Sequence, residues 1–247
     1  MSIDLDKCYP DTEVYYTTWL GGTSGAFISM CLYNLTTAQL EIKLSEFGHA
    51  HINQQQLRKK NHVTLGLGPI YKTTVPKIST NPLILYGHEN DIEFDYLFNK
   101  YPKCKLIIIH VEDKMIPRLI GNMLYKNWTS HGDMIWSSIR STHKFMTEYE
   151  NPNDVPSGLV EKFIAMYRKN YKKDPFFFDK TFLPDTYKGS IFYIDFYDII
   201  HNMSKVLNQL SEITNRPVTP FLEQQALNYQ NKQIELVNSK MPWLDDK

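Results

Sequence analysis

The sequence predicts an α/β fold with a central, mostly parallel sheet and flanking helices. Three stretches carry this prediction. The first, Val14–Thr36, is a β-rich run that passes through a glycine turn into a helical pattern. The other two, Leu83–Tyr86 and Lys105–Val111, are short and almost continuously apolar. Continuous apolar runs are typical of strands that are buried on both faces of a parallel sheet. A chain of 247 residues is long enough for a substantial core, and we expect a single domain over residues 1–247.

Composition narrows the classes of protein to which the chain can belong. The 27 basic and 27 acidic residues balance, so no overall field favours a nucleic-acid or membrane partner. The chain has three widely spaced cysteines, Cys8, Cys31 and Cys104. An odd number at this spacing predicts a reducing compartment without a disulfide framework. No apolar run has the length of a membrane span, and the start of the chain lacks the apolar core of a signal peptide. We therefore expect a cytoplasmic protein.

The turn after the first strand is the main candidate for ligand binding. A β-rich run over Val14–Leu20 ends at two glycines, and a helical pattern begins at about Ala26. Such a turn can bind a phosphate, because glycines allow close approach of the backbone and the helix N-terminus adds a positive dipole end. The alternative is a tight turn in which a Thr or Ser hydroxyl only caps the helix. The candidate binding residues are Gly21, Gly22, Thr23, Ser24, Gly25 and Ala26.

The spacing of this turn separates it from two common nucleotide loops. Gly25 is followed by Ala26 and not by the lysine of a Walker A motif. Glycines at positions 21, 22 and 25 also do not match the dinucleotide pattern G-x-G-x-x-G. A short loop that wraps a single phosphate fits this sequence better.

The segment between the first two predicted strands is polar and irregular. Glu46–Asn61 contains His49 and His51, a spacing that can bind a metal ion when both side chains face one way. No Cys, Asp or second His group stands nearby to complete a metal site, so a solvated loop or helix is the expected structure. Gly66–Pro82 contains several Gly and Pro residues and is expected to be a loop with room for one short strand.

A histidine follows the second strand directly. Leu83–Tyr86 is expected to be buried in the sheet, and Gly87 and His88 end it. Ligands of open α/β sheets bind at the carboxyl ends of the strands, so His88 is a candidate functional residue. A modest helix over Asp91–Asn99 then leads to the strand Lys105–Val111.

The helix after this strand carries a polar stripe. Pro117 fits the first turn of a helix better than its middle. Arg118, Asn122 and Lys126 then recur at four-residue intervals, which places a guanidinium, an amide and an ammonium on one side of the helix. The alternative is an ordinary solvated face.

The rest of the chain is predicted to be helical apart from one strand and two loops. The aromatic loop is expected to pack over the core or, less often, to form a substrate lid. The predicted elements are a helix over Asp133–Tyr149, a loop over Asn151–Gly158, a helix over Leu159–Tyr171, the aromatic loop Lys172–Gly189, a strand over Ser190–Asp195, and helices over Phe196–Thr214 and Pro220–Ser239.

The order of these features resembles the P-loop sulfotransferases, which use 3′-phosphoadenosine 5′-phosphosulfate, over roughly two thirds of the chain. Leu20–Ala26 stands where that family has its Pro-Lys-Ser-Gly-Thr-type loop, and Leu85–His88 looks like the stretch that ends Lys-Thr-His. Lys105–Asn122 stands where the family has a strand, an Arg-x-Pro signature and a helix Ser. Tyr193–Asp198 is similar to the late Tyr-Glu-Asp segment.

This resemblance implies a three-layer, P-loop sulfotransferase-like fold and transfer of a sulfuryl group to an acceptor hydroxyl or amine, without a metal. The turn residues 21–26 would hold the 5′-phosphate of the donor, and His88 would be the catalytic base. Arg118, Asn122 or Lys126 would hold the 3′-phosphate. The acceptor would be a small molecule or a glycan, and a divergent member of the kind found in viral genomes is expected.

Three departures from the family leave alternatives open. The loop lysine is missing, with Leu20 or Thr23 in its place, and the Arg-x-Pro signature is missing as well. No Arg-Lys-Gly stretch with a following Gly-Asp-Trp occurs near the end of the chain. One alternative is a catalytically inactive relative that acts as a nucleotide-binding or interaction protein. Another is a P-loop transferase or kinase that uses a nucleoside triphosphate, although the missing Gly-Lys-Ser/Thr opposes it.

Overall fold

The computed structural model describes residues 10–20, 23–36, 63–65, 82–87, 92, 94–122, 147–150, 154–170, 174–183 and 185–241. The predicted His49 and His51 pair and nearly all of the predicted helix Asp133–Tyr149 lie outside these residues. Residues 147–149, at the end of that predicted helix, are in a turn and an irregular stretch.

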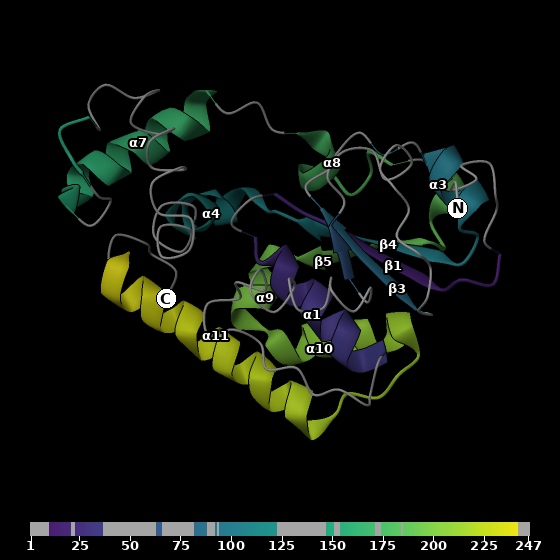
Figure 1. Cartoon of the computed structure of the whole chain (residues 1–247). Coiled ribbons are helices and arrows are strands. Elements are labelled where there is room, and N and C mark those ends of the chain that lie inside the picture. Colours follow the sequence, from purple (N-terminus) through teal and green to yellow (C-terminus); the bar gives the residue numbers. More distant parts are fainter. Residues whose placement is uncertain are drawn as a thin grey trace.

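Five parallel strands form one sheet in the order β2-β3-β1-β4-β5. The first strand in the chain therefore lies at the centre, between β3 and β4 (Figure 1). This arrangement confirms the predicted α/β fold with a mostly parallel sheet. The strands are β1 (Val14–Thr18), β2 (Val63–Leu65), β3 (Leu83–Gly87), β4 (Cys104–His110) and β5 (Ile191–Asp195).

The strand boundaries differ from the sequence-based ones at a few points. β1 ends at Thr18 and not at Leu20, because the amide and hydroxyl of Thr23 both bond back to the carbonyl of Leu20 and turn the chain there. β2 was not predicted as a strand of its own. It is only three residues long and lies beside a polar segment, so the sequence shows no alternation of apolar and polar residues there.

Helices connect the strands and cover both faces of the sheet. Pro117 lies in the first turn of its helix, as predicted. The described helices are α1 (Gly25–Thr36), α3 (Phe94–Lys100), α4 (Ile116–Gly121), α7 (Ser157–Asn170), α8 (Pro175–Phe178), α9 (Phe196–His201), α10 (Met203–Thr214) and α11 (Pro220–Lys240), with short 3₁₀ turns at Asp113–Met115 and Asp185–Tyr187. None of these helices is both long enough and apolar enough to cross a membrane.

The helix predicted over Phe196–Thr214 is interrupted at Asn202. The backbone of Asn202 leaves the helical region, at φ −134° and ψ 52°, and its side-chain amide donates to the carboxylate of Asp198 at 2.9 Å. Asparagine favours such breaks because its side chain competes with the helical hydrogen bonds. Two helices, α9 and α10, replace the single one.

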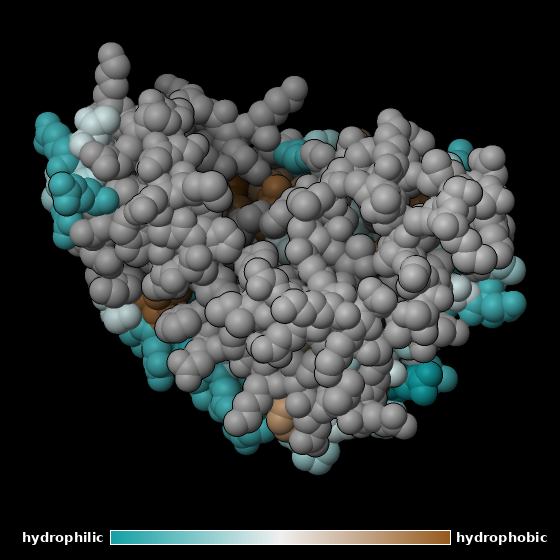
Figure 2. All heavy atoms as spheres, in the orientation of Figure 1, coloured by the Kyte–Doolittle hydropathy of each residue, from teal (hydrophilic) through white to brown (hydrophobic). Residues whose placement is uncertain are grey.

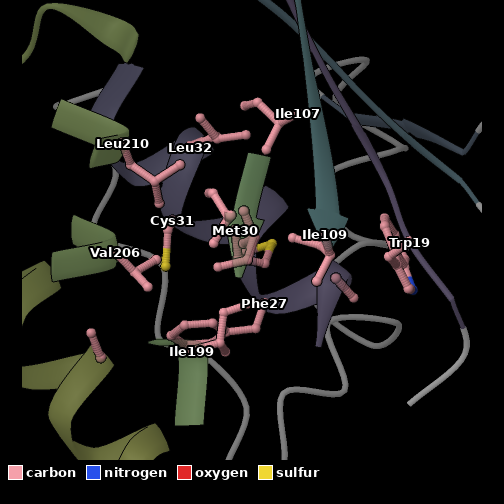
Figure 3. Close-up of a cluster of buried hydrophobic side chains, with 14 of the residues drawn as sticks. Trp19, Phe27, Met30, Cys31, Leu32, Ile107, Ile109, Ile199, Val206 and Leu210 are labelled. Atoms are coloured by element: carbon pink, nitrogen blue, oxygen red, sulfur yellow. The ribbon is translucent and has the colours of Figure 1, made fainter. Parts of the chain in front are cut away.

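Two apolar clusters hold the layers together. On one face, α1, α9, α10 and α11 pack against side chains such as Ile107 and Ile109 of β4 (Figure 3). On the other face, α3 and α8 pack against the alternate side chains of β1 and β4. Phe176 and Phe177 are buried in this second cluster, which confirms that the aromatic loop packs over the core. Asp174 caps α8 by accepting from the amide of Phe176 at 3.0 Å, so part of the predicted loop is a helical turn.

Candidate functional site

The strand order defines where a ligand is expected. The connection that leaves β1 leads to one side of the sheet, and β4 lies on the other side of β1. In open parallel sheets, ligands bind outside the carboxyl ends of the strands at such a reversal of strand order. Here the reversal lies between β1, which ends at Thr18, and β4, which ends at His110. The turn that was predicted to bind a phosphate follows β1 at this edge.

The described part of the turn is tightly organised. Thr23 is fully buried, and its hydroxyl donates to the carbonyl of Leu20 at 2.8 Å. Ser24 has a φ of 69°, and its carbonyl accepts the amides of Phe27 and Ile28 at 2.9 and 3.3 Å. A serine in the left-handed region is uncommon, and such conformations cost about 1–3 kcal/mol. These hydrogen bonds at the start of α1 stabilise Ser24 in its left-handed conformation.

A packing contact explains the glycine at position 25. A Cβ atom on Gly25 would lie 1.9 Å from Cδ2 of the Trp19 indole, which is well inside any permitted contact. The structure therefore gives Gly25 a packing role against Trp19. The amide nitrogens of Gly25 and Ala26 belong to the first turn of α1, where helical amides lack partners within the helix and can bind an anion.

The C-terminal helix α11 lies directly against this turn. The hydroxyl of Tyr229 donates to the hydroxyl oxygen of Ser24, and its ring stacks on Phe27 with centroids 3.8 Å apart. Burial raises the pKa of the Tyr229 phenol far above its ordinary value, while the positive charge of Arg118 acts in the opposite direction. Arg118 is thus close enough to Tyr229 to act on it electrostatically.

Arg118, from α4, is buried against the same side of α11. The residue is 1% exposed, and Nη2 of its guanidinium donates to the backbone carbonyl of Gln233 at 2.7 Å. Gln233 lies one helical turn beyond Tyr229 and is fully buried. Asn122, one turn beyond Arg118, is also fully buried. The predicted alternative of a solvated face is therefore wrong for these two positions of the stripe.

The structure thus brings together some of the predicted site residues and leaves the others untested. Ser24 and Arg118 come from segments that are far apart in sequence, and both contact neighbouring turns of α11. The outward side of α11 is mostly hydrophilic (Figure 2). Four predicted site residues, Gly21, Gly22, His88 and Lys126, lie outside the described residues.

A second polar group at the same edge was missed by the sequence analysis. His110 ends β4, Asp195 ends β5, and the two residues are partners in the parallel register. His110 Nδ1 lies 2.7 Å from Asp195 Oδ1, and Lys180 Nζ lies 2.6 Å from the same oxygen. The signal was present in the sequence, since Asp195 ends a predicted strand and His110 is the second-last residue of the predicted strand Lys105–Val111. Only His88 was predicted to be functional on this ground.

The charges around Asp195 keep this carboxylate ionised. Burial acts to raise the pKa of Asp195, but hydrogen bonds and positive charge from His110 and Lys180 outweigh burial and lower it to about 2. The pKa of Asp179 is held below its usual value by hydrogen bonds from the amide and hydroxyl of Thr181, with a smaller contribution from His110. In the described part of the chain, no cluster of three or more His, Cys, Asp or Glu residues could hold a metal ion.

The sequence matches no protein-family model and no curated protein. Among solved structures, the fold is similar to that of the sulfotransferase STF1 from Mycobacterium tuberculosis. The TM-score is 0.36 at 10% sequence identity, and the match covers 94% of this chain and 77% of that chain. A superposition this loose supports no conclusion on activity.

Proposed function

We propose that the protein is a sulfotransferase-type enzyme that moves a sulfuryl group from 3′-phosphoadenosine 5′-phosphosulfate to an acceptor hydroxyl or amine. One observation carries this proposal. Ser24, in the turn after β1, and Arg118, in the helix after β4, contact Tyr229 and Gln233 on neighbouring turns of α11. These two segments were predicted to hold the two phosphates of one donor, and their proximity allows a single ligand to reach both.

The 5′-phosphate of the donor would bind at the start of α1. The carbonyl of Ser24 already accepts the amides of Phe27 and Ile28, so the amides of Gly25 and Ala26 are the described groups best suited to an anion. Gly21 and Gly22 would complete the loop. The hydroxyls of Thr23 and Ser24 have protein partners and would contribute through the backbone conformation that they stabilise.

The 3′-phosphate would bind to Arg118, together with Asn122 and Lys126. A guanidinium suits this role because it forms forked, charge-assisted hydrogen bonds with phosphate oxygens. Arg118 is 1% exposed under α11, with Nη2 on the carbonyl of Gln233, so its guanidinium is covered in this structure. Donor binding would therefore require a local shift of α11.

The same contacts favour a second candidate function. The hydroxyl of Ser24 and the guanidinium of Arg118 are both used by α11, which supports the alternative of a catalytically inactive relative. In that case the residues would serve the stability of the fold, and the protein would act as a nucleotide-binding or interaction protein.

Calorimetric titration and a transfer assay separate these candidates. Adenosine 3′,5′-bisphosphate should bind more tightly than adenosine 5′-phosphate, ATP or NAD, and should raise the melting temperature with concentration. Labelled donor should transfer sulfate to at least one of three probe acceptors, namely phenol, glucose and glucosamine. Bisphosphate binding without transfer would favour the inactive relative. No binding of any nucleotide would contradict the enzyme and would leave only the interaction protein.

Ala26→Pro tests the proposed phosphate site directly. Proline is tolerated in the first turn of a helix and removes the amide hydrogen at that position. Because its ring also restricts Gly25, the melting temperature of the variant is measured alongside binding. Loss of one charge-assisted hydrogen bond should weaken bisphosphate binding about ten- to a hundredfold. Ala26→Ser keeps the amide and should bind normally. Equal affinity of the two variants, at an unchanged melting temperature, would remove Ala26 from the site.

A further inference from the structure

The pair formed by His110 and Asp195 is separate from Ser24 and Arg118, which contact α11. The donor site proposed above does not use this pair. We infer that His110 is the catalytic base that accepts the proton of the acceptor, and that Asp195 is the residue that positions it. This inference rests on the proposed sulfuryl transfer. It assigns the base to the end of β4, whereas the sequence-based candidate, His88, follows β3.

The hydrogen bond between the two residues determines which ring nitrogen is available. An ionised carboxylate only accepts hydrogen bonds, so in the neutral ring the hydrogen must lie on His110 Nδ1, which is 2.7 Å from Asp195 Oδ1. The lone pair then lies on Nε2, at the opposite side of the ring. A histidine oriented by a carboxylate in this way can accept a proton through Nε2.

The charged neighbours support this arrangement. Lys180 shares Oδ1 of Asp195 with His110, and the hydrogen bonds from both residues, together with the charge of Lys180, stabilise the carboxylate in its ionised form. Asp179 lies close enough for its charge to act on the ring, and the ring of Tyr193 meets that of His110 edge-on at 6.3 Å. Lys180, Asp195, Asp179 and Tyr193 are the titratable neighbours of His110 that these contacts identify within the described chain. The side chain of His110 is 11% exposed, so part of it is accessible from the surface.

The sheet places the end of β4 beside the strand that leads into the proposed phosphate turn, with His110 on the same face of β4 as Ile108. β1 has β4 as one neighbour, and Thr18 at the end of β1 is the register partner of Ile108, two residues before His110. The turn that begins after β1 therefore leaves the sheet at the level where β4 presents His110. A sulfuryl group attached to a phosphate in the turn would lie at this same edge of the sheet.

The donor supplies both the sulfuryl group and the leaving group of the proposed step. The acceptor hydroxyl loses its proton to His110 Nε2 while its oxygen forms a bond to the sulfur of the donor. The bond between that sulfur and the bridging phosphate oxygen breaks, and the phosphate keeps the electron pair. The products are the sulfated acceptor, adenosine 3′,5′-bisphosphate and a protonated His110, which releases its proton to solvent.

A purely structural role for the pair is the rival explanation, since Lys180 and Asp195 also join the segment after α8 to β5. His110→Asn distinguishes the two, because the asparagine amide can still donate to Asp195 but carries no base. A catalytic His110 predicts a fall in kcat of roughly 10²–10⁴-fold, with bisphosphate affinity and melting temperature unchanged. The transfer assay uses whichever of the three probe acceptors reacts fastest.

Three further measurements sharpen the test. Asp195→Asn should lower kcat, counted per molecule that still binds the bisphosphate, and leave KM for the acceptor within about twofold. His201→Asn, at a histidine that lies beside Tyr197 in α9, should keep full activity. Nitrogen NMR of the His110 ring at pH 8 should show the hydrogen on Nδ1.

Each contrary result has a distinct meaning. Normal turnover by His110→Asn, or the hydrogen on Nε2 at pH 8, would overturn the assignment of His110. The assignment would also be overturned if His88→Gln abolished turnover while His110→Asn did not. If the wild-type protein neither bound the bisphosphate nor transferred sulfate, the proposed function would fail, and the assignment would fail with it.

Discussion

Tyr229 in the C-terminal helix α11 donates a hydrogen bond to the hydroxyl of Ser24, 205 residues earlier in the chain. Ser24 has a left-handed backbone conformation, so this contact ties a strained residue at the start of α1 to the last helix. Any ligand that changes the turn is therefore coupled to α11.

Tyr229→Phe removes this hydrogen bond and keeps the ring that stacks on Phe27. We expect the free energy of unfolding to fall by about 1 kcal/mol, the net value of a buried hydrogen bond. Urea denaturation measures this, and the double variant with Ser24→Ala should lose less than the sum of the single changes. Additive losses would show that the two hydroxyls do not interact.

Gly25→Ala should destabilise the protein, because the new Cβ would overlap the indole of Trp19 at 1.9 Å. Overpacking of this kind costs about 1–3 kcal/mol. The matched control is Gly158→Ala in the first turn of α7, where a Cβ meets nothing within 4 Å. Trp19→Leu should be less harmful in the Gly25→Ala background than in the wild type, and equal costs in both backgrounds would rule out the clash. A bulky residue at position 25 would thus test packing before it tested ligand binding.

Arg118→Met should weaken adenosine 3′,5′-bisphosphate more than adenosine 5′-phosphate, because only the former carries the 3′ group. We expect a difference of about ten- to a hundredfold, the loss of one charge-assisted contact. Calorimetry of the folded variant measures both affinities. Because the change also removes the hydrogen bond from Arg118 to the carbonyl of Gln233, a fall in melting temperature is expected too. Equal weakening of both ligands would place Arg118 away from the 3′-phosphate.

The stability of the protein should depend on the ionisation of Asp195 at acidic pH. Its pKa in the folded protein is lowered from 3.8 to about 2, so the ionised carboxylate stabilises the fold above pH 4 and this contribution is lost as the pH falls toward 2. The shift corresponds to roughly 2 kcal/mol. Urea unfolding should show Asp195→Asn clearly weaker than the wild type at pH 6, with a smaller gap at pH 3. A gap independent of pH would contradict this assignment.

The parts of the fold with strong local patterns could be predicted from the sequence. The apolar run of β4 predicts a buried strand. Pro117 restricts where α4 can begin. β2 could not be predicted, because a three-residue strand depends on pairing with β3 and not on its own pattern. The break at Asn202 depends on a side-chain bond to Asp198 that residue spacing alone does not reveal.

The site was harder to predict than the fold. Ser24 and Arg118 were predicted as site residues from the sequence. Their shared contact with α11 was not, because it depends on Tyr229 and Gln233, which look like ordinary residues of an amphipathic helix in the sequence. The pair of His110 and Asp195 depends on the register between β4 and β5. A one-residue shift in that register would turn one of these side chains to the opposite face of the sheet.

The central position of β1 also has a consequence for synthesis on the ribosome. Val14 pairs with Leu83 and Cys104, so its partners are 69 and 90 residues later in the chain (83 − 14 and 104 − 14). At about 5–20 residues per second, β1 waits several seconds for both neighbours to emerge. During that interval a strand rich in aromatic and β-branched residues has both hydrogen-bonding edges open. A strand that is fully buried in the finished protein is thus open to aggregation while the chain is being made.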